Sequence, residues 1–364
     1  MDKHWSKQLF WIHRITGLVA GIMLLLASCS GSLLVFNEEI DQALNAHLHQ
    51  VRPGAIRKPI QEQLSSARRA LRGGHPYLLV TKLPEAPTET TVIRAEYSVE
   101  NKVYLFVNPY TAEVIAQRGN KDYFMGWLLY FHFSLLAGKT GAQVMLVTGI
   151  LLFLSLLTGT WIYRKSFRKV LTFKAPLEWH KRKRRWRNLH RIIGVWAVLF
   201  NLLIAFTGVL MECKIIDARK NPAAIFTEVP VNADYDRLMI KAESQIPGLT
   251  VMGIRPPKKA GDPVRFLGHA RESAIWGEYP SAVSFDPASG AIVKTIDFSK
   301  ATFGDKFNAC ISPLHFGNYG GILVKILYSL FALTPGILSV SGFLIWYRRK
   351  FIIKTHRNPL PQAV

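Results

Sequence analysis

Four apolar segments without a single charged residue constrain this chain more than any other feature. They run from Ile15 to Phe36, from Thr140 to Tyr163, from Ile192 to Met211 and from Ile326 to Tyr347. A helix needs about 20 residues to cross a hydrocarbon core of about 30 Å, and each segment has that length. We therefore predict an α-helical membrane protein with four membrane-spanning helices.

Basic residues lie beside the predicted helices and predict their orientation. The loop 164–188 holds eleven Lys and Arg residues against one acid, Glu178, and the tail 348–364 adds five more cations. The long segments are nearly balanced, with 12 cations to 10 acids in 37–139 and 13 to 12 in 212–318. Because Lys and Arg accumulate in cytoplasmic loops, both termini should be cytoplasmic. The net charge of +22 is then explained by membrane topology, because the excess cations lie beside membrane helices, and it does not indicate a nucleic-acid partner.

Two features that involve cysteine have alternative interpretations. Residues Leu26 to Cys29 match a lipoprotein cleavage box, but the apolar run continues to Phe36 and cleavage would remove half of the first helix. We therefore expect this helix to stay intact. Cys213 and Cys310 both lie on the outer side, where they could form a disulfide or stay as two isolated thiols.

The chain contains the same order of features twice. Each half has a membrane helix, an outer segment with strand and turn patterns, an aromatic stretch with a histidine, and a second membrane helix. The matched pieces are HRxxG with HRxxG, YFHFSLLAGKTG with PLHFGNYGG, NPYTAEV with DPASGAIV, and WIYRK with IWYRRK. This internal duplication predicts a four-helix transmembrane bundle with two small periplasmic α+β domains, its halves related by an axis along the membrane normal.

The duplication also divides the chain. We assign 1–36 to the N-terminus and first helix, 37–125 to the first outer domain, 126–163 to the aromatic-histidine stretch and second helix, 164–188 to the basic loop, 189–211 to the third helix, 212–310 to the second outer domain, 311–347 to the second aromatic-histidine stretch and fourth helix, and 348–364 to the tail. Within the outer domains, the patterns predict helices at 61–72 and 235–245 and strands at 90–97, 103–117 (with a turn at 108–111), 249–254 and 282–285.

Four of the eleven histidines lie at matching ends of the predicted helices. His13 and His190 begin the first and third helices on the cytoplasmic side, and His132 and His315 precede the second and fourth on the outer side. An ionisable side chain at such a place is costly and usually has a partner. Two histidines that approach each other across a bundle axis can supply both axial ligands of one haem iron. We therefore expect two bis-histidine haem sites; four unconnected interfacial residues are the alternative.

Glycines and basic residues recur beside these histidines. Gly17 and Gly194 lie one turn after the inner histidines, while Gly31 and Gly208 lie 18 residues after them, roughly 27 Å along a helix. A missing side chain would let a flat macrocycle approach, although glycine also serves helix packing in membranes. Three basic residues could meet haem propionates: Arg14, Arg191 and Lys325.

These residues resemble the PepSY-associated transmembrane helix family. The resemblance rests on HRxxG, FHFSLLAGKTG, the turn VNPYTAEVI and the ending TGTWIY, and it covers essentially the whole chain; Ala112 stands where the turn of the family commonly has glycine. The branch most similar in length and plan is that of bacterial inner-membrane ferric-siderophore reductases of the ferrioxamine type. The resemblance implies two haem b groups and reduction of siderophore-bound Fe(III) at the periplasmic face. Electron transfer of this kind requires no catalytic acid–base group, and we name no catalytic residue.

The sequence also bears on the electron donor, and it leaves two competing functions open. Since the chain has no Gly-rich dinucleotide fingerprint, a separate cytoplasmic donor is expected. A non-enzymatic membrane protein could instead bind a peptide, a protease or a siderophore through its outer domains, with structural histidines. A transporter of the intact ferric siderophore is a third hypothesis, which four helices favour less.

Overall fold

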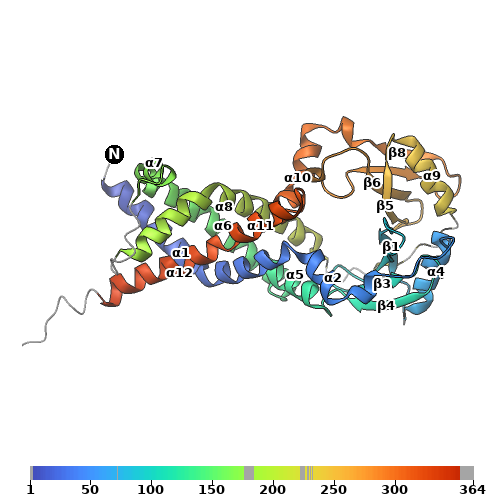
Figure 1. Cartoon of the computed structure of the whole chain (residues 1–364), viewed down its shortest axis with the longest axis horizontal. Helices are drawn as coiled ribbons and strands as arrows, with labels where there is room; N and C mark the ends of the chain where they lie inside the picture. The colour runs from blue at the N-terminus through green and yellow to red at the C-terminus, as the bar shows by residue number, and fades with distance from the viewer. Residues whose placement is uncertain are drawn as a thin grey trace, which may run out of the picture.

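Four long apolar helices form one end of the molecule (Figure 1). In the computed structural model, they are α1 (Lys3–Leu34), α6 (Gly138–Tyr163), α8 (Arg185–Ala218), and a fourth in two parts, α11 (Gly321–Ala332) and α12 (Thr334–Tyr347). All four are long and apolar enough to cross a membrane, which confirms the predicted membrane helices. The structure describes residues 3–71, 73–175, 184–221, 226–227, 229, 231 and 233–352, so residues 176–183 of the basic loop and 353–364 of the tail lie outside it.

The helices form a ring in which each one packs against two neighbours. Both α1 and α8 pack against α6 and α12, so α1 and α8 lie at opposite corners of the bundle. Hydroxyl groups join the helices inside the apolar layer: Ser32 Oγ lies 2.7 Å from Ser329 Oγ, and Thr334 Oγ1 donates to Asn201 Oδ1 at 3.0 Å. Thr334 begins α12 and is followed by Pro335, which suits the first turn of a helix and explains why the fourth helix is divided there.

The other end of the molecule is one antiparallel sheet of eight strands. The first half supplies β1 (Tyr77–Lys82), β2 (Thr91–Glu96), β3 (Lys102–Val107) and β4 (Val114–Gly119); the second supplies β5 (Thr250–Arg255), β6 (Val264–His269), β7 (Ser281–Phe285) and β8 (Ile292–Ile296). Their order is β4-β3-β2-β1-β5-β6-β7-β8, so each half is a meander and the halves meet where β1 pairs with β5. The two outer segments, expected as two domains, therefore share one sheet.

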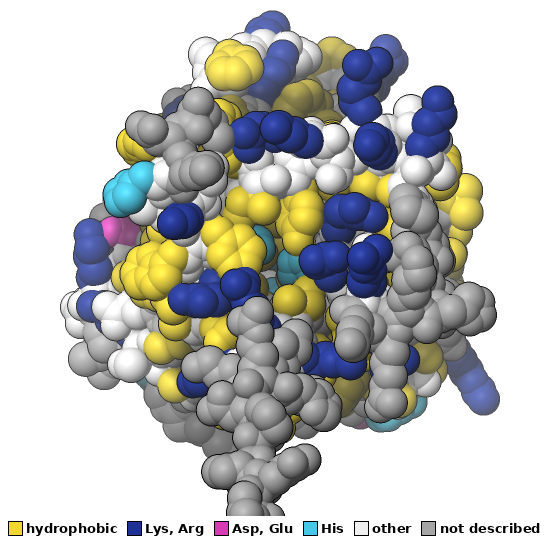
Figure 2. Space-filling model, turned by 90° about the vertical axis from the view of Figure 1, so that its left-hand side faces the viewer, with side chains coloured by type: hydrophobic (Ala, Val, Ile, Leu, Met, Phe, Trp, Pro, Cys, Tyr) yellow, Lys and Arg dark blue, Asp and Glu magenta, His cyan; other side chains and the backbone are white. Residues whose placement is uncertain are grey.

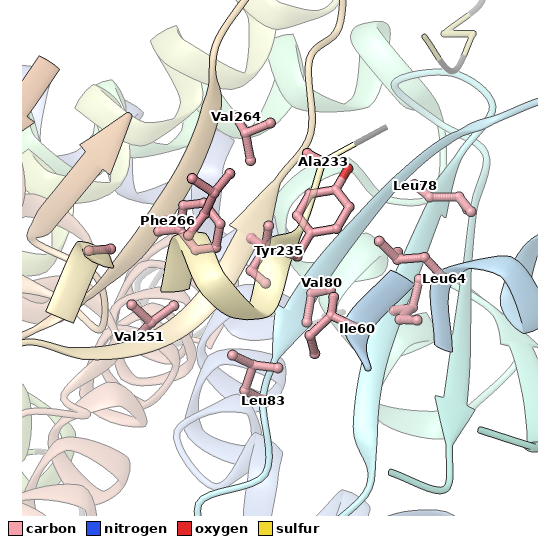
Figure 3. Packing of buried hydrophobic residues seen from close by; sticks show 14 of the residues in the cluster. Ile60, Leu64, Leu78, Val80, Leu83, Ala233, Tyr235, Val251, Val264 and Phe266 are labelled. Carbon is pink, nitrogen blue, oxygen red and sulfur yellow. The ribbon is translucent and has the colours of Figure 1, made fainter. Parts of the chain in front are cut away.

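One hydrophobic core covers a face of this sheet in both halves (Figure 3). The helices α4 (Ile60–Ala70) and α9 (Tyr235–Gln245) lie over this face and pack against strand residues such as Val80 and Phe266. Side chains along a strand alternate between the two faces, so the residues between these apolar positions lie on the opposite face. Because the apolar core is continuous across the β1–β5 junction, burying it joins the outer segments into one body.

The opposite face of the sheet looks toward the membrane helices. Arg118 on β4, Tyr104 on β3 and Arg94 on β2 are cross-strand neighbours and share this face. The guanidinium of Arg118 donates to both carboxylate oxygens of Asp41, at 2.9 and 2.5 Å. Asp41 belongs to α2 (Asn37–Leu44), which follows α1 directly, so this ion pair links the sheet to the outer end of the bundle. We call this side the bundle-facing face of the sheet.

Shorter helices complete the chain. The helices that connect the sheet to the second and fourth membrane helices are α5 (Phe124–Ser134) and α10 (Phe303–Phe316). The remaining short elements are α3 (Ala46–His49), η1 (Arg164–Ser166), α7 (Phe167–Leu171), η2 (Ala274–Trp276), η3 (Phe298–Lys300) and the π-helical turn η4 (Arg348–Ile352).

The two halves repeat each other down to individual turns. Between β3 and β4, the amide of Ala112 donates to Asn108 O at 2.9 Å; between β7 and β8, the amide of Gly290 donates to Asp286 O at 2.9 Å. Ala112 and Gly290 both adopt the left-handed conformation, with φ of 58° and 64°. Glycine adopts this conformation without steric cost and alanine does not. The turn of the first half, with Ala112, therefore carries a steric cost that the turn of the second half does not.

The cysteines are free thiols. Cys213 and Cys310 form no disulfide, and Cys29 lies within an unbroken α1. Of the two arrangements open for Cys213 and Cys310, the structure has the isolated thiols.

Candidate functional site

The inner pair of histidines spans the bundle at its basic end. His13 lies on α1 and His190 on α8, the two helices at opposite corners, and the ring centres are 6.1 Å apart with planes at 80°. Two imidazoles on opposite sides of one metal, each with a metal–nitrogen bond of about 2 Å, would have ring centres about 6 Å apart. The inner pair therefore has the separation needed to hold one metal ion between its rings.

The outer pair comes from the connecting helices. His132 lies on α5 and His315 on α10, and the two rings are close enough to interact electrostatically. Each ring lies against a membrane helix: a Cβ built on Gly31 of α1 would stand 3.0 Å from Cε1 of His132, and one on Gly208 of α8 would stand 3.0 Å from Cε1 of His315. The connecting helices thus bring the outer rings onto the two helices that carry the inner pair.

All four rings rest on the same local arrangement, a hydroxyl residue followed by glycine on a membrane helix. We call it the hydroxyl–glycine cradle, and the four cradles are Ser30-Gly31, Thr158-Gly159, Thr207-Gly208 and Ser341-Gly342. Their hydroxyl oxygens lie at 2.9 Å from His132 Nδ1, 3.4 Å from His13 Nδ1, 3.0 Å from His315 Nδ1 and 2.9 Å from His190 Nδ1, respectively. A Cβ on each glycine would stand between 3.0 and 3.4 Å from Cε1 of the same ring. Sequence reasoning missed the hydroxyls and two of the glycines.

The cradles determine which ring nitrogen is available. The hydroxyls of Ser30, Thr158 and Thr207 donate to carbonyl groups of the preceding helical turn, as does that of Ser341, so each keeps a lone pair for a ring N–H. We therefore assign the proton of each ring to Nδ1. The lone pair then stays on Nε2, which receives no hydrogen bond from the described part of the chain. Metal-binding histidines usually donate their other N–H to an oxygen in this way.

The inner cradle of His13 differs in its main acceptor. The carbonyl oxygen of Ser155 accepts from His13 Nδ1 at 2.9 Å, while the hydroxyls of Ser155 and Thr158 are farther away, at 3.3 and 3.4 Å. The other three rings have a hydroxyl at 2.9 to 3.0 Å. His13 is therefore the ring that depends least on a side-chain hydroxyl.

Gly17 and Gly194 do not lie beside the inner rings. The atom nearest to a Cβ on Gly17 is Ser155 Oγ, at 3.9 Å, and the one nearest to a Cβ on Gly194 is Leu338 Cδ2, at 3.7 Å. Side chains on a helix cover the turn toward its N-terminus, so a histidine does not reach a glycine one turn later on its own helix. The glycines of the two inner cradles, on α6 and α12, contact the inner rings instead. The room that Gly17 and Gly194 would leave for a flat macrocycle stays a prediction.

The predicted basic partners differ from one another. Arg14 is exposed, and Arg191 is half-buried with an Nε atom that has no hydrogen-bond partner among the described residues. A buried donor without an acceptor is costly, so this position suits an anion. Lys325 already donates to Glu39 Oε1 at 2.6 Å. Figure 2 shows Lys and Arg side chains around the basic end, with histidine side chains deeper between the helix ends.

Two comparisons relate the chain to known proteins, and one of them covers both of its halves. A family model for the PepSY-associated TM region matches residues 10–349, which include both histidine pairs and the sheet. An uncharacterized protein of Pseudomonas aeruginosa is 23% identical over 265 residues, or 61% of this chain and 63% of that relative. The chain thus spans less than two thirds of the length of this curated relative. This membrane protein, with its four candidate spans, belongs to the family defined by the PepSY-associated TM region.

Proposed function

We propose that this protein is a dihaem b-type electron-transfer protein of the bacterial inner membrane that reduces siderophore-bound Fe(III) at the periplasmic face. The observation that carries the proposal is the set of four hydroxyl–glycine cradles, which leave Nε2 of two opposed ring pairs available to iron. Haem held by two histidines supplies one-electron chemistry and offers no open position for oxygen or substrate. This favours electron transfer over ligand activation.

The residues of the chain would bind the two haem groups, orient the ligating rings and neutralise propionate charge. His13 and His190 would hold the inner group, and His132 and His315 the outer one. The cradles fix the tautomer and the rotation of each ring, as outer-shell partners do at metal sites. Arg191, with its buried and unpartnered Nε, suits a propionate carboxylate at the inner end.

The direction of the reaction follows from the charges at the two ends. We assign the basic end to the cytoplasm and the sheet to the periplasm, because Lys and Arg accumulate in cytoplasmic loops. The net reaction takes one electron from a cytoplasmic donor and converts one Fe(III) outside to Fe(II). An electron that moves outward runs with an inside-negative potential, worth roughly 2.3 kcal/mol per 100 mV for a complete crossing. Fe(II) is held less tightly than Fe(III) by hard oxygen ligands, so the chelate releases it.

Haem content and absorbance test the proposal directly. Protein purified after haem-replete expression should show a Soret band and two haem b groups per chain in a dithionite-reduced minus oxidised spectrum. His132→Ala should keep about half of the haem and lose reduction of an external ferric chelate. His75→Ala, at an exposed position in the outer region, is the matched control and should keep both. Absence of a Soret band from the parent protein would favour the non-enzymatic binding protein instead.

A further inference from the structure

Besides Arg118, which pairs with Asp41, five basic side chains gather on the bundle-facing face of the sheet, and we call these five the cationic face. They come from both halves of the chain and are Arg94 on β2, Lys102 on β3, Arg255 on β5, Lys258 in the turn after it, and Arg265 on β6. The strand members alternate with fully buried core residues, namely Ile93, Ile254, Val264 and Phe266 around the three arginines. Alternation therefore places these cations opposite the core, on the side of the membrane helices.

One acid neutralises part of the cationic face. Glu96, on β2, pairs with Arg94 at 2.7 Å and with Lys258 at 3.6 Å. A second acid, Glu100, is shared by Arg219 at the end of α8 and by Lys121, so it adds no net negative charge. Within the described ranges, the other three members of the cationic face have no ion pair.

Two of these three cations oppose each other directly. Arg255 and Arg265 are cross-strand partners, and like charges at directly opposite positions destabilise a sheet. Burial and the charge of Arg265 lower the pKa of Arg255, although the side chain stays accessible at the surface. An anion between the two guanidinium groups would replace this repulsion with charge-assisted hydrogen bonds, and arginine matches the geometry of carboxylates and similar oxyanions.

Acidic residues gather at the other end of β1. Glu278, before β7, is raised in pKa by burial and by the charges of Glu38 on α2 and Glu85. Glu85 lies beyond the last residue of β1, whereas Glu96, the acid beside the cationic face, is the cross-strand neighbour of Tyr77, the first residue of β1. The outer region is thus polarised along β1, with its positive part around the cationic face.

We infer that the cationic face binds the ferric substrate as an anionic chelate, one that holds iron through an excess of carboxylate or catecholate oxygens. The inference rests on the proposed function and names its substrate class. It differs from the ferrioxamine type that the sequence resemblance implied, because ferric trihydroxamates of that type are neutral or cationic. Charge complementarity of this kind concentrates an anionic substrate at the surface and weakens as salt screens it.

Gallium chelates test the inference without electron transfer. The three probes are the doubly anionic Ga(III)–DTPA complex, the neutral Ga(III) tris-acetohydroxamate and the monocationic Ga(III)–desferrioxamine B. Their binding to the full chain in detergent is measured by calorimetry at low and at high salt. We expect the anionic probe to bind about tenfold more tightly than the cationic one, and this preference to shrink at high salt. Equal binding of the three probes, or tightest binding of the cation, would overturn the inference.

Substitutions locate the binding to the cationic face. The double variant Arg255→Gln/Arg265→Gln should bind the anionic probe about tenfold more weakly, whereas Arg237→Gln, at an exposed position of α9 over the other face, should bind it like the parent. Removal of a like-charge pair should leave the melting temperature unchanged or higher, which separates lost binding from unfolding. Lys102→Gln gives a second variant with a smaller loss. Unchanged binding in both variants refutes the site, while the haem content of the same samples reports separately on the proposed function.

Discussion

The two ends of the bundle hold equivalent rings in different surroundings. At the inner end, the rings belong to the membrane helices α1 and α8 themselves and lie among the basic side chains of the helix ends. At the outer end, the rings belong to the short helices α5 and α10, turn back onto α1 and α8, and lie beneath the sheet. The comparison shows that the hydroxyl–glycine cradles set the geometry of each ring. The residues around the rings, basic side chains at one end and the sheet at the other, determine which molecule can approach each pair.

The largest effect is expected from a substitution that removes one histidine ring from one end of the bundle. His190→Ala should lose the inner haem and keep the outer one, because the outer rings rest on separate cradles. The sample should contain about one haem per chain, and its spectrum should differ from that of His132→Ala. Loss of both groups from either variant would show that the two ends are not independent.

A smaller effect is expected where a glycine supports an outer ring. In Gly208→Ala, the new Cβ would stand 3.0 Å from His315 Cε1, so the ring must shift by a few tenths of an ångström. Haem content should fall at the outer end alone, measured by pyridine haemochrome assay and difference spectroscopy. Gly21→Ala is the control, since its nearest neighbour, Ser339 Cβ, would be at an ordinary 4.0 Å. An equal loss in both variants would contradict the role of the cradle.

The hydroxyls allow a direct comparison between the ends. Thr207→Val removes the hydroxyl at 3.0 Å from His315 Nδ1, whereas Thr158→Val removes a more distant one, at 3.4 Å from His13 Nδ1. Both rings keep a backbone carbonyl acceptor, that of Ile204 for His315 and that of Ser155 for His13. A neutral hydrogen bond is worth about 1 kcal/mol, which corresponds to about 40 mV for a one-electron couple. The imidazole of His315 becomes a weaker electron donor when it loses the hydrogen bond to the Thr207 hydroxyl, so Thr207→Val should raise the outer midpoint potential in a spectroelectrochemical titration. A comparable shift in Thr158→Val would refute the difference between the cradles.

The smallest effect concerns the sheet and should leave both histidine pairs unchanged. Ala112→Gly relieves a left-handed alanine and should stabilise the protein by about 1 kcal/mol, visible as a higher melting temperature. Gly290→Ala should lose a similar amount at the matching turn of the other half. Changed haem spectra in either variant would show that the turns act on the bundle as well as on the sheet.

Much of this arrangement could be predicted because it depends on local sequence. Charge-free runs specify the membrane helices, and the duplication makes His13 match His190 and His132 match His315. The three strands β1, β6 and β8 were not predicted: YLLVTK in β1 lacks a clear alternation, and β8 is largely exposed. The pairing of β1 with β5 joins residues that are far apart in sequence, so no local pattern predicts the single sheet.

The cradles were missed because their residues are common in membrane helices. Ser, Thr and Gly usually mediate helix packing there, so no single dipeptide stands out. A signal was nevertheless available, since a hydroxyl residue followed by glycine recurs at the outer ends of α1 and α8 and at the inner ends of α6 and α12. Gly17 and Gly194 were predicted to give a flat macrocycle room; they touch neither inner ring, since helical side chains point toward the preceding turn, and their predicted role stays untested.

The origin of the two rings in each histidine pair explains why the two halves are joined in one chain. Each pair takes one ring from each half, so a half-length polypeptide would own one inner and one outer ring and complete neither site. Two such polypeptides would need to dimerise, with their first strands joined edge to edge as β1 and β5 are. Fusion into one chain makes that association intramolecular, so both sites can assemble at any protein concentration in the membrane.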